Sequence, residues 1–439
     1  MTTSFATPPA AARYRLANAT IPAVLLPGDI GIDAGEGLSR VDILVADGAI
    51  AAIAAPGSLG ADEVPVLDLD KGQVWPCFVD MHTHLDKGHI IPRHANPDGT
   101  FPGALAAVEA DREAHWTTAD VRARMEFALR CAYAHGTKLI RTHIDSVPPQ
   151  FPASWPAFVE AREAWAGRID LQAVALMPID LYFDDAYVKR LVETLLEAKG
   201  VIGGVTFMID GLDKALDRLF FEASKNGLDI DLHVDETADP NARSLRAIAE
   251  AAIRHDFEGQ VTVGHCCSLA RQPDDEAERT LDLVEKAGIG VVSLPMCNMY
   301  LQDRHRGRTP RWRGVTLLHE MRARGIPAAV ASDNTRDPFY AYGDLDVMEV
   351  FREAVRILQL DHPVDLAPEV VTTLPAMQLR RPDVGRLVIG GPADLVLFRA
   401  RSWTELLSRP QSDRTVLRQG KAIDRTLPDY RELDHLFGV

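Results

Sequence analysis

The feature that most constrains the fold of this 439-residue chain is an alternation of short apolar runs with amphipathic, helix-length stretches. The middle of the chain contains eight such runs. They are Val74–Met81, Lys138–Thr142, Leu171–Met177, Val201–Met208, Asp229–Leu232, Gln260–Val263, Gly290–Leu294 and Ile326–Ala331. Eight β/α units predict an α/β fold of the (β/α)₈ TIM-barrel type, while a doubly wound open sheet is the alternative that alternation alone leaves open.

The stretch between the first two runs shows how the helices are delimited. Thr117 and Asp120 have the spacing of a capping box, and Gly136 is suited to end the helix that follows. We therefore expect a helix between these positions.

Both ends of the chain have a different texture, with short apolar alternations broken by glycine. Such alternations occur at Val41–Val45 and Ile50–Ile53 around Asp47-Gly48, at Ala393–Phe398, and at Thr415–Ile423 around Gly420. We expect the two ends to form one small β-sandwich, which predicts a division into residues 1–77, the barrel at 78–384, and residues 385–439.

Composition excludes several classes of function. A net charge of -16 without a block of like charges argues against a nucleic-acid partner, although it says little about a small substrate. No run of 18 apolar residues occurs, and Met1–Arg15 lacks the pattern of a secretory signal, so neither a membrane span nor secretion is expected. The five cysteines contain no C-x-x-C pair, which favours a reducing, cytoplasmic location.

Polar residues follow the apolar runs at the positions where barrel enzymes carry their active sites, the carboxyl ends of the strands. These residues are His82, His84, His143, Asp145, His233, Glu236, His265, Asn298 and Asp333. Buried imidazoles and carboxylates are costly unless they are paired or bind a metal. Their recurrence at one end therefore favours a metal site over chance, although each alone has a structural explanation, such as a helix cap at Asp333 or a core histidine at His265.

The spacing His82-x-His84 places two imidazoles on one face of a strand, because strand side chains alternate. A nitrogen of His233 and an oxygen of Asp333 would complete a three-histidine, one-carboxylate set that zinc or ferrous iron accepts. Water bound to such an ion has a pKa near ~7 instead of ~15.7. The sequence thus predicts a hydrolase with a metal-activated nucleophile.

These residues resemble the amidohydrolase superfamily, and within it the cytosine deaminase branch. The motifs that carry the resemblance are Phe78–Asp86, Arg141–Asp145, His233–Glu236, Asn298–Arg304 and Asp333–Pro338. The fourth run, Val201–Met208, contains no lysine, so the resemblance implies one divalent ion per subunit, zinc first and iron second, and not the carbamylated-lysine pair of ions.

The resemblance also implies roles for individual residues. The metal ligands it implies are His82, His84, His233 and Asp333. His265 and Asp333 are implied to deprotonate the attacking water, and Glu236 to carry a proton to a ring nitrogen. Homo-oligomerisation is a further expectation from the resemblance.

Two departures from cytosine deaminases bear on the substrate. Met177-Pro178-Ile179 stands where those enzymes have a glutamine that reads the ring, and Asn334 replaces a second aspartate. We expect Met177, Gln302, Asn334 and His143 to contact substrate, with support of the metal ligands as the alternative role of His143. Asp86, Lys87 and Asp180 are expected near the mouth of the site, where they could contact substrate, but we interpret them as exposed loop charges.

The substrate class stays open at this point. The expected reaction is hydrolytic release of ammonia from an amino-substituted nitrogen heterocycle: a pyrimidine, pterin, triazine or creatinine-like ring. The stretch Ala331–Asp337 also resembles N-isopropylammelide amidohydrolases, so a cyclic-amide or N-alkyl amidohydrolase is the alternative, and a non-catalytic ligand-binding barrel is a third possibility.

Overall fold

The computed structural model describes residues 4–60 and 64–438, which fall into two compact units. A terminal unit contains residues up to 79, 130–139 and 346–427. A barrel unit contains 80–129, 140–345 and the residues from 428 onwards. The expected boundary at 77/78 lies close to the observed one. The boundary expected at 384/385 differs from the division into compact units, because residues 346–384 belong to the terminal unit.

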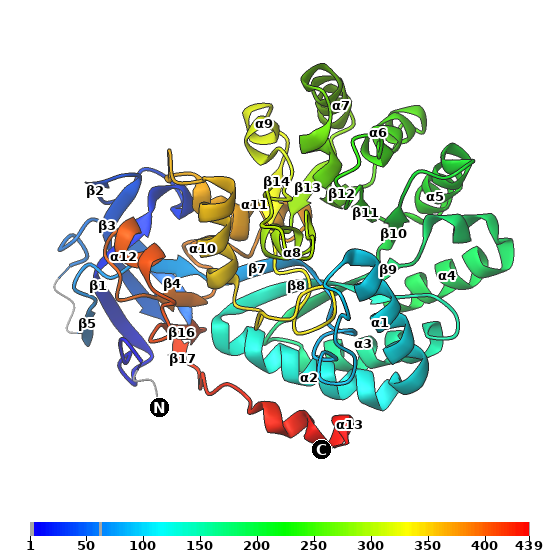
Figure 1. Cartoon of the computed structure of the whole chain (residues 1–439). Coiled ribbons are helices and arrows are strands. Elements are labelled where there is room, and N and C mark those ends of the chain that lie inside the picture. Colours follow the sequence, from blue (N-terminus) through cyan, green and yellow to red (C-terminus); the bar gives the residue numbers. More distant parts are fainter. Residues whose placement is uncertain (1–3, 61–63, 439) are drawn as a thin grey trace. The chain divides into compact units, whose positions relative to one another are not determined.

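Eight strands correspond to the eight apolar runs (Figure 1). They are β7 (Phe78–Thr83), β8 (Thr137–Asp145), β9 (Asp170–Leu176), β10 (Ile202–Thr206), β11 (Ile230–Val234), β12 (Val261–His265), β13 (Gly290–Ser293) and β14 (Ala328–Val330). The first run differs from expectation, because Val74–Pro76 forms a separate strand, β6, in the terminal unit. Pro76 lacks the N–H that a continuous central strand would need.

Strand pairing closes the barrel. One sheet has the order β7-β8-β9, and a parallel sheet runs β10-β11-β12-β13-β14. Parallel bridges join Val174 to Val201 on one side and Thr83 to Asp333 on the other. The eight strands thus form a ring, and the open-sheet alternative is wrong.

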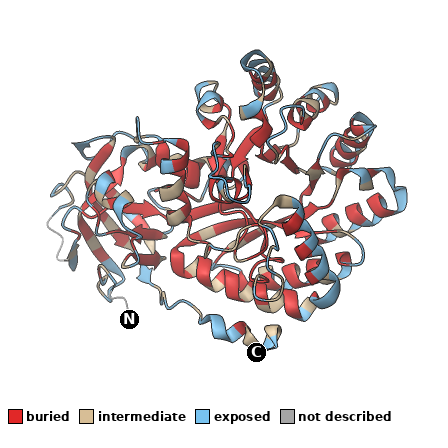
Figure 2. Ribbon diagram, in the orientation of Figure 1, coloured by how far each residue is buried: buried red, intermediate tan, exposed pale blue. Residues whose placement is uncertain are grey.

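Most helices of the barrel unit lie around the outside of the strands, whereas the short α13 (Asp434–Phe437) lies apart from them near the C-terminus (Figure 1). The other helices of this unit are α1 (Phe101–His115), α2 (Thr118–His135), α3 (Phe151–Trp165), α4 (Asp185–Ala198), α5 (Leu212–Asn226), α6 (Ser244–Arg254), α7 (Asp274–Lys286), α8 (Pro295–Leu301) and α9 (Leu318–Ala323), with α2 continuing into the terminal unit. Figure 2 shows buried faces on α5, α6 and α7 turned toward the strands and exposed faces turned outward. No helix in the described part of the chain combines the length and apolarity needed to cross a membrane.

Local sequence explains these helices. In α5, Leu212, Ala215, Leu216 and Leu219 are buried at helical spacing, and Gly227 ends the helix in the left-handed region at φ 65°. The predicted start of α2 is confirmed. One of the two hydrogen bonds of a capping box is present, because the hydroxyl of Thr117 accepts from the backbone N–H of Asp120 at 3.2 Å.

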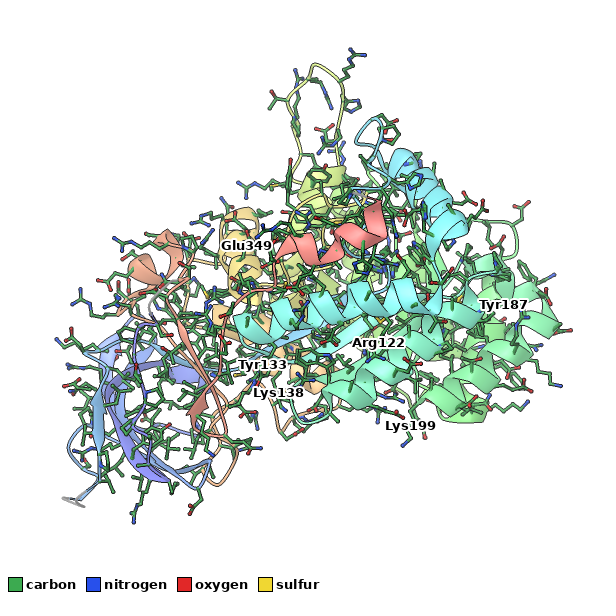
Figure 3. All side chains as sticks on the ribbon, turned by 90° about the horizontal axis from the view of Figure 1, so that it is seen from below. Arg122, Tyr133, Lys138, Tyr187, Lys199 and Glu349 are labelled. Atoms are coloured by element: carbon green, nitrogen blue, oxygen red, sulfur yellow. The ribbon has the colours of Figure 1, made fainter. Side chains whose placement is uncertain are left out.

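Exposed ion pairs link neighbouring helices. Arg122 of α2 lies 2.7 Å from Glu160 of α3 (Figure 3). Such exposed pairs contribute about 0–1 kcal/mol each, so the packing of apolar faces dominates the stability of the helical ring.

The terminal unit contains two sheets. The first joins β1 (Arg13–Pro22), β2 (Ile32–Gly35), β3 (Leu38–Ala46), β4 (Ala49–Ala54) and β5 (Val66–Asp68); the second joins β6 (Val74–Pro76), β15 (Leu395–Leu397), β16 (Thr415–Arg418) and β17 (Lys421–Ala422). The two alternations expected around Asp47-Gly48 lie on β3 and β4, which pair antiparallel, and both turn residues have positive φ. β6 pairs antiparallel with β15, so the two ends of the chain share one sheet as expected.

Residues 346–384 complete the terminal unit, with α10 (Val347–Leu358) and α11 (Thr373–Gln378); α12 (Trp403–Ser408) lies in its last stretch. Asp346 caps α10 and pairs through Oδ1 with Nη1 of buried Arg414 at 2.7 Å. An internal ion pair of this kind ties the segment to the sheet-bearing part of the same unit.

Candidate active site

The residues predicted as metal ligands converge at the carboxyl end of the barrel. His82 lies on β7, His84 directly follows that strand, His233 lies on β11, and Asp333 follows β14. His233 Nε2 lies 3.1 Å from His82 Nε2 and 3.2 Å from His84 Nε2. Asp333 Oδ1 lies 3.2 Å from His84 Nε2. Each of the four residues presents one ligand atom within 4.8 Å of the others.

This cluster fits a divalent metal ion. Burial, reinforced by neighbouring histidines, lowers the pKa of all three imidazoles well below 6.5, so each neutral ring offers one unprotonated nitrogen as a ligand. Neither oxygen of Asp333 accepts a hydrogen bond from the described residues. Burial raises the pKa of Asp333 to about 7, and a bound cation would hold it ionised instead. Neutral imidazoles and a carboxylate meeting at one point form a donor set for zinc or ferrous iron.

The backbone around Asp333 is fixed by the first barrel strand. Asp80 accepts from the backbone N–H of Ser332 at 3.0 Å and from its hydroxyl at 2.5 Å. The N–H of Asp333 donates to His82 O at 2.8 Å, and Asp333 has φ 65°. A non-glycine residue in the left-handed region is strained, and such residues gather at functional sites. Asp80 therefore positions Asp333 and is absent from the predicted site.

A second left-handed residue, Asp235 at φ 47°, sets the direction of its neighbour Glu236. The Asp235 carboxylate accepts from the backbone N–H groups of Ser244 and Leu245 at 3.0 Å each, which caps α6. With Asp235 engaged in this way, Glu236 lines the cavity beside His233.

Two amides of α8 hold Glu236. Asn298 donates from Nδ2 to Glu236 Oε1 at 3.2 Å, and the same nitrogen lies 2.9 Å from His265 Nδ1. One turn later, Gln302 donates to the backbone oxygen of Glu236 at 3.2 Å. Since Asn298 donates to Nδ1, the proton of neutral His265 lies on Nε2.

Burial shifts both titratable groups of this cluster. It raises the pKa of Glu236 well above 4.5, and the negative charge of Asp333 acts in the same direction. Burial also lowers the pKa of His265 to about 3. Burial thus favours the uncharged forms of both Glu236 and His265.

A cavity of about 460 Å³ opens onto the metal cluster. Its polar side is formed by His84, His233, Glu236, His265, Asp333 and Asn334, and its apolar side includes Phe101, Leu105, Val108, Met177, Phe207 and Phe339. This size and mixture suit a small ring held by a few polar groups. α1 supplies part of the apolar wall, a contribution with no local signal in the sequence.

Of the four residues expected to contact substrate, Met177 and Asn334 line this cavity. Gln302 is instead turned to the backbone of Glu236. His143 is fully buried and its ring lies 4.0 Å from that of His82, so it is not among the described lining residues. The structure thus brings two of the four to the cavity.

Asn334 is itself held in place. Its Nδ2 donates to Asp337 Oδ2 at 2.7 Å, and its Oδ1 accepts from the Cys297 thiol at 3.5 Å. One N–H of the amide therefore remains for a ligand.

The interpretation of Asp86, Lys87 and Asp180 as exposed loop charges is wrong for two of these residues. Asp86 and Lys87 are buried, whereas Asp180 is exposed as expected. Lys87 Nζ lies 3.4 Å from Asp145, whose carboxylate also accepts from Arg112 at 3.1 Å. Lys87, Asp145 and Arg112 of α1 thus form a network of paired charges on the cavity wall.

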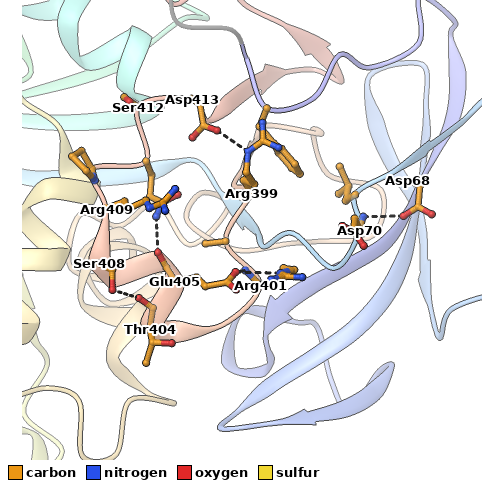
Figure 4. Close-up of a pocket in the computed structure, with 15 residues that line it drawn as sticks. Asp68, Asp70, Arg399, Arg401, Thr404, Glu405, Ser408, Arg409, Ser412 and Asp413 are labelled. Carbon is orange, nitrogen blue, oxygen red and sulfur yellow. Dashed lines mark hydrogen bonds and ion pairs between the residues drawn. The ribbon is translucent and has the colours of Figure 1, made fainter.

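The terminal unit contains a larger cavity, of about 870 Å³ (Figure 4). Four of its charged side chains pair with one another: Arg399 with Asp413 at 3.0 Å and Arg401 with Glu405 at 2.8 Å. Each of these four side chains has a partner of opposite charge. The smaller cavity, which opens onto the metal cluster, is therefore the candidate active site.

Comparison with known proteins agrees with this geometry. A model of the "Amidohydrolase family" matches residues 159–424. Pterin deaminase from Rhizobium rhizogenes strain K84 is 64% identical over 439 residues, covering 100% of both chains.

Two more distant proteins are similar over most of their length. N-isopropylammelide isopropyl amidohydrolase from Pseudomonas sp. strain ADP is 25% identical over 346 residues, 76% of this chain and 82% of that protein. The crystal structure of 5-methylcytosine deaminase from Klebsiella pneumoniae, liganded with 5-fluorocytosine, matches with a TM-score of 0.81 at 25% identity. That match covers 94% of this chain and 98% of the other.

Proposed function

This chain belongs to the amidohydrolase family. We propose that it is a metal-dependent pterin deaminase. The resemblance indicated by the strand-end motifs is thus confirmed at the level of the family. The observation that carries the proposal is Glu236, a partly buried carboxyl group with a raised pKa that lines the cavity beside the metal cluster. The full-length similarity to a pterin deaminase supports pterin over the other rings considered.

The proposed reaction replaces the amino group on C2 of the 2-amino-4-oxopteridine ring by an oxygen from water. One pterin and one water give one 2,4-dioxopteridine and one ammonia. The apolar wall formed by Phe101, Leu105 and Phe207 suits a flat bicyclic ring, and Met177 replaces the amide that would read a cytosine.

When held by His82, His84, His233 and Asp333, a divalent ion lowers the pKa of water from ~15.7 to ~7. The chain's own residues then move the protons. Glu236 donates its proton to the unprotonated ring nitrogen next to C2, which makes C2 electrophilic, and Asp333 accepts a proton from the attacking water.

The remaining transfers return both carboxyl groups to their starting states. The new hydroxyl on C2 passes its proton to Glu236, and Asp333 gives its proton to the departing amine, which leaves as ammonia. In the tautomer set by Asn298, His265 carries its proton on Nε2 and donates a hydrogen bond to the water oxygen. This role differs from the expected one, in which His265 shared the deprotonation with Asp333.

We propose zinc as the metal, with ferrous iron as the alternative, at one ion per subunit. The three-imidazole, one-carboxylate donor set supports both ions. We also propose a homo-oligomer in the cytoplasm with no nucleic-acid or membrane partner. Five free, buried cysteines support a reducing compartment.

A substrate comparison tests the proposal. Metal-loaded protein is given pterin, cytosine and N-isopropylammelide, and ammonia and the product masses are measured. We expect one ammonia per pterin and 2,4-dioxopteridine as the product. Release of isopropylamine from N-isopropylammelide, with no ammonia from pterin, would establish the second candidate, which the similarity to an N-isopropylammelide amidohydrolase favours.

A further inference from the structure

Beside the metal cluster, three further ligand atoms come together. Glu236, Cys297 and Asp333 each present one ligand atom within 4.8 Å of the others. Cys297 lies on α8 and is 1% exposed, and its thiol donates to Asn334 Oδ1 at 3.5 Å. The proposed reaction uses the two carboxyl groups but leaves this thiol without a part.

Asp333 has a coordination position to spare. Its Oδ1 faces the imidazoles of His82 and His84, at 3.6 Å and 3.2 Å. Neither of its oxygens accepts a hydrogen bond from the described residues, although the side chain is 1% exposed. A carboxylate with two unpartnered oxygens can bridge two cations.

Access to this position is through the candidate active site. Glu236 and Asp333 both line the 460 Å³ cavity, and Glu236 keeps 13% of its side chain exposed, whereas Cys297 is 1% exposed and is not among the described lining residues. A cation that enters the cavity therefore meets the two carboxyl groups, with the thiol next to them.

We propose that Glu236, Cys297 and Asp333 form a second, inhibitory site for a thiophilic divalent cation such as Cd²⁺ or excess Zn²⁺. Binding forms a metal–sulfur bond, and the thiol proton passes to solvent, with no change in oxidation state. Soft thiolate ligands select zinc-like and cadmium-like ions over Mg²⁺ or Mn²⁺. Inhibition rests on the proposed function, because Glu236 bound to a cation cannot exchange a proton with the ring.

The site is tested by titrating Cd²⁺ into enzyme that already holds one equivalent of its metal. The readouts are the ultraviolet thiolate-to-cadmium charge-transfer band, the metal bound per subunit, and pterin deamination. We expect the band to saturate with one further cation per subunit as activity falls, and Mg²⁺ to produce neither effect.

Two variants test whether the sulfur that binds Cd²⁺ is that of Cys297. Cys297→Ser should abolish the band and weaken Cd²⁺ inhibition by about 10-fold or more, since a soft ligand is lost. Cys267→Ser removes another fully buried thiol of the same unit and should keep the band. If Cys297→Ser does not fold, Cys297→Ala replaces it in the experiment. Thermal unfolding shows whether each variant is folded.

A band that persists without Cys297 would overturn the proposal. So would a second bound cation without a band, which would place it at a thiol-free cluster such as His94, Asp111 and His115. Failure to bind any second cation would have the same effect. The band requires no substrate, so failure of this site and failure of pterin deamination without added Cd²⁺ are separate results.

Discussion

Asn298 donates a hydrogen bond of 3.2 Å to the Glu236 carboxylate, although the two residues are 62 positions apart in the sequence. Asn298 is fully buried on α8, next to His265 as well as Glu236. A single amide therefore sets both the position of the proton carrier and the tautomer of the neighbouring imidazole.

Removing this amide should impair the chemical step more than substrate binding. We expect Asn298→Ala to lower kcat by about 10-fold to 100-fold, because a small misplacement of a reacting group is enough to cost about 100-fold. KM should change little and bound metal should not change. Steady-state kinetics with metal analysis checks this, with Asn241→Ala, an exposed asparagine, as the control. A rise in KM at unchanged kcat would mean that Asn298 contacts substrate instead.

Removal of the metal should destabilise the protein as well as inactivate it. A ligand that binds only the folded state at about 100 times its Kd adds about 2.7 kcal/mol to the free energy of unfolding. Chelation should therefore lower the Tm of the native protein but not that of His84→Ala, which already lacks a ligand. His362→Ala, at an exposed position, should behave like the native protein. Equal Tm values with and without chelator would argue against a metal at this cluster.

The ion pair of Asp346 with Arg414 should stabilise the terminal unit in a pH-dependent way. Burial alone would raise the pKa of Asp346, but the charge and hydrogen bonds of Arg414, with His135, lower it below its usual value. Since breaking a buried pair costs about 3–5 kcal/mol, Asp346→Asn should lower the free energy of unfolding by that order at pH 7.

The sign of the pH effect follows from the lowered pKa. A carboxylate with a depressed folded-state pKa stabilises above its unfolded pKa of ~3.9, and that contribution is lost as the pH falls below it. The difference between native protein and Asp346→Asn should thus shrink in strong acid. Denaturant unfolding at several pH values measures it, with exposed Asp361→Asn as the control. A difference that stays constant with pH would contradict the assignment.

The sequence predicted the parts of this molecule that depend on short-range patterns. Period-two and helical spacings located the eight strands, and the strand-end positions of His82, His84, His233 and Asp333 placed them together, because parallel strands in a barrel end on one side.

Residues whose role depends on packing between distant segments were not predictable in this way. Asp86 and Lys87 look like loop charges in the sequence, but both are buried next to Asp145. His143 lies at a strand end, but its ring packs against that of His82. Gln302 was expected at the substrate, whereas the turn of α8 directs it to the Glu236 backbone. In each case the side-chain partner comes from another segment of the chain, which the local sequence pattern does not specify.

The most direct test of the central claim is the turnover of pterin by Glu236→Gln, compared with native protein at equal bound metal. Glutamine keeps the size and hydrogen bonding of the side chain but cannot donate a carboxyl proton. Since general acid–base catalysis contributes about 10²- to 10⁴-fold, kcat for ammonia release should fall by that factor. Ammonia release from pterin at the native rate by Glu236→Gln would contradict the account.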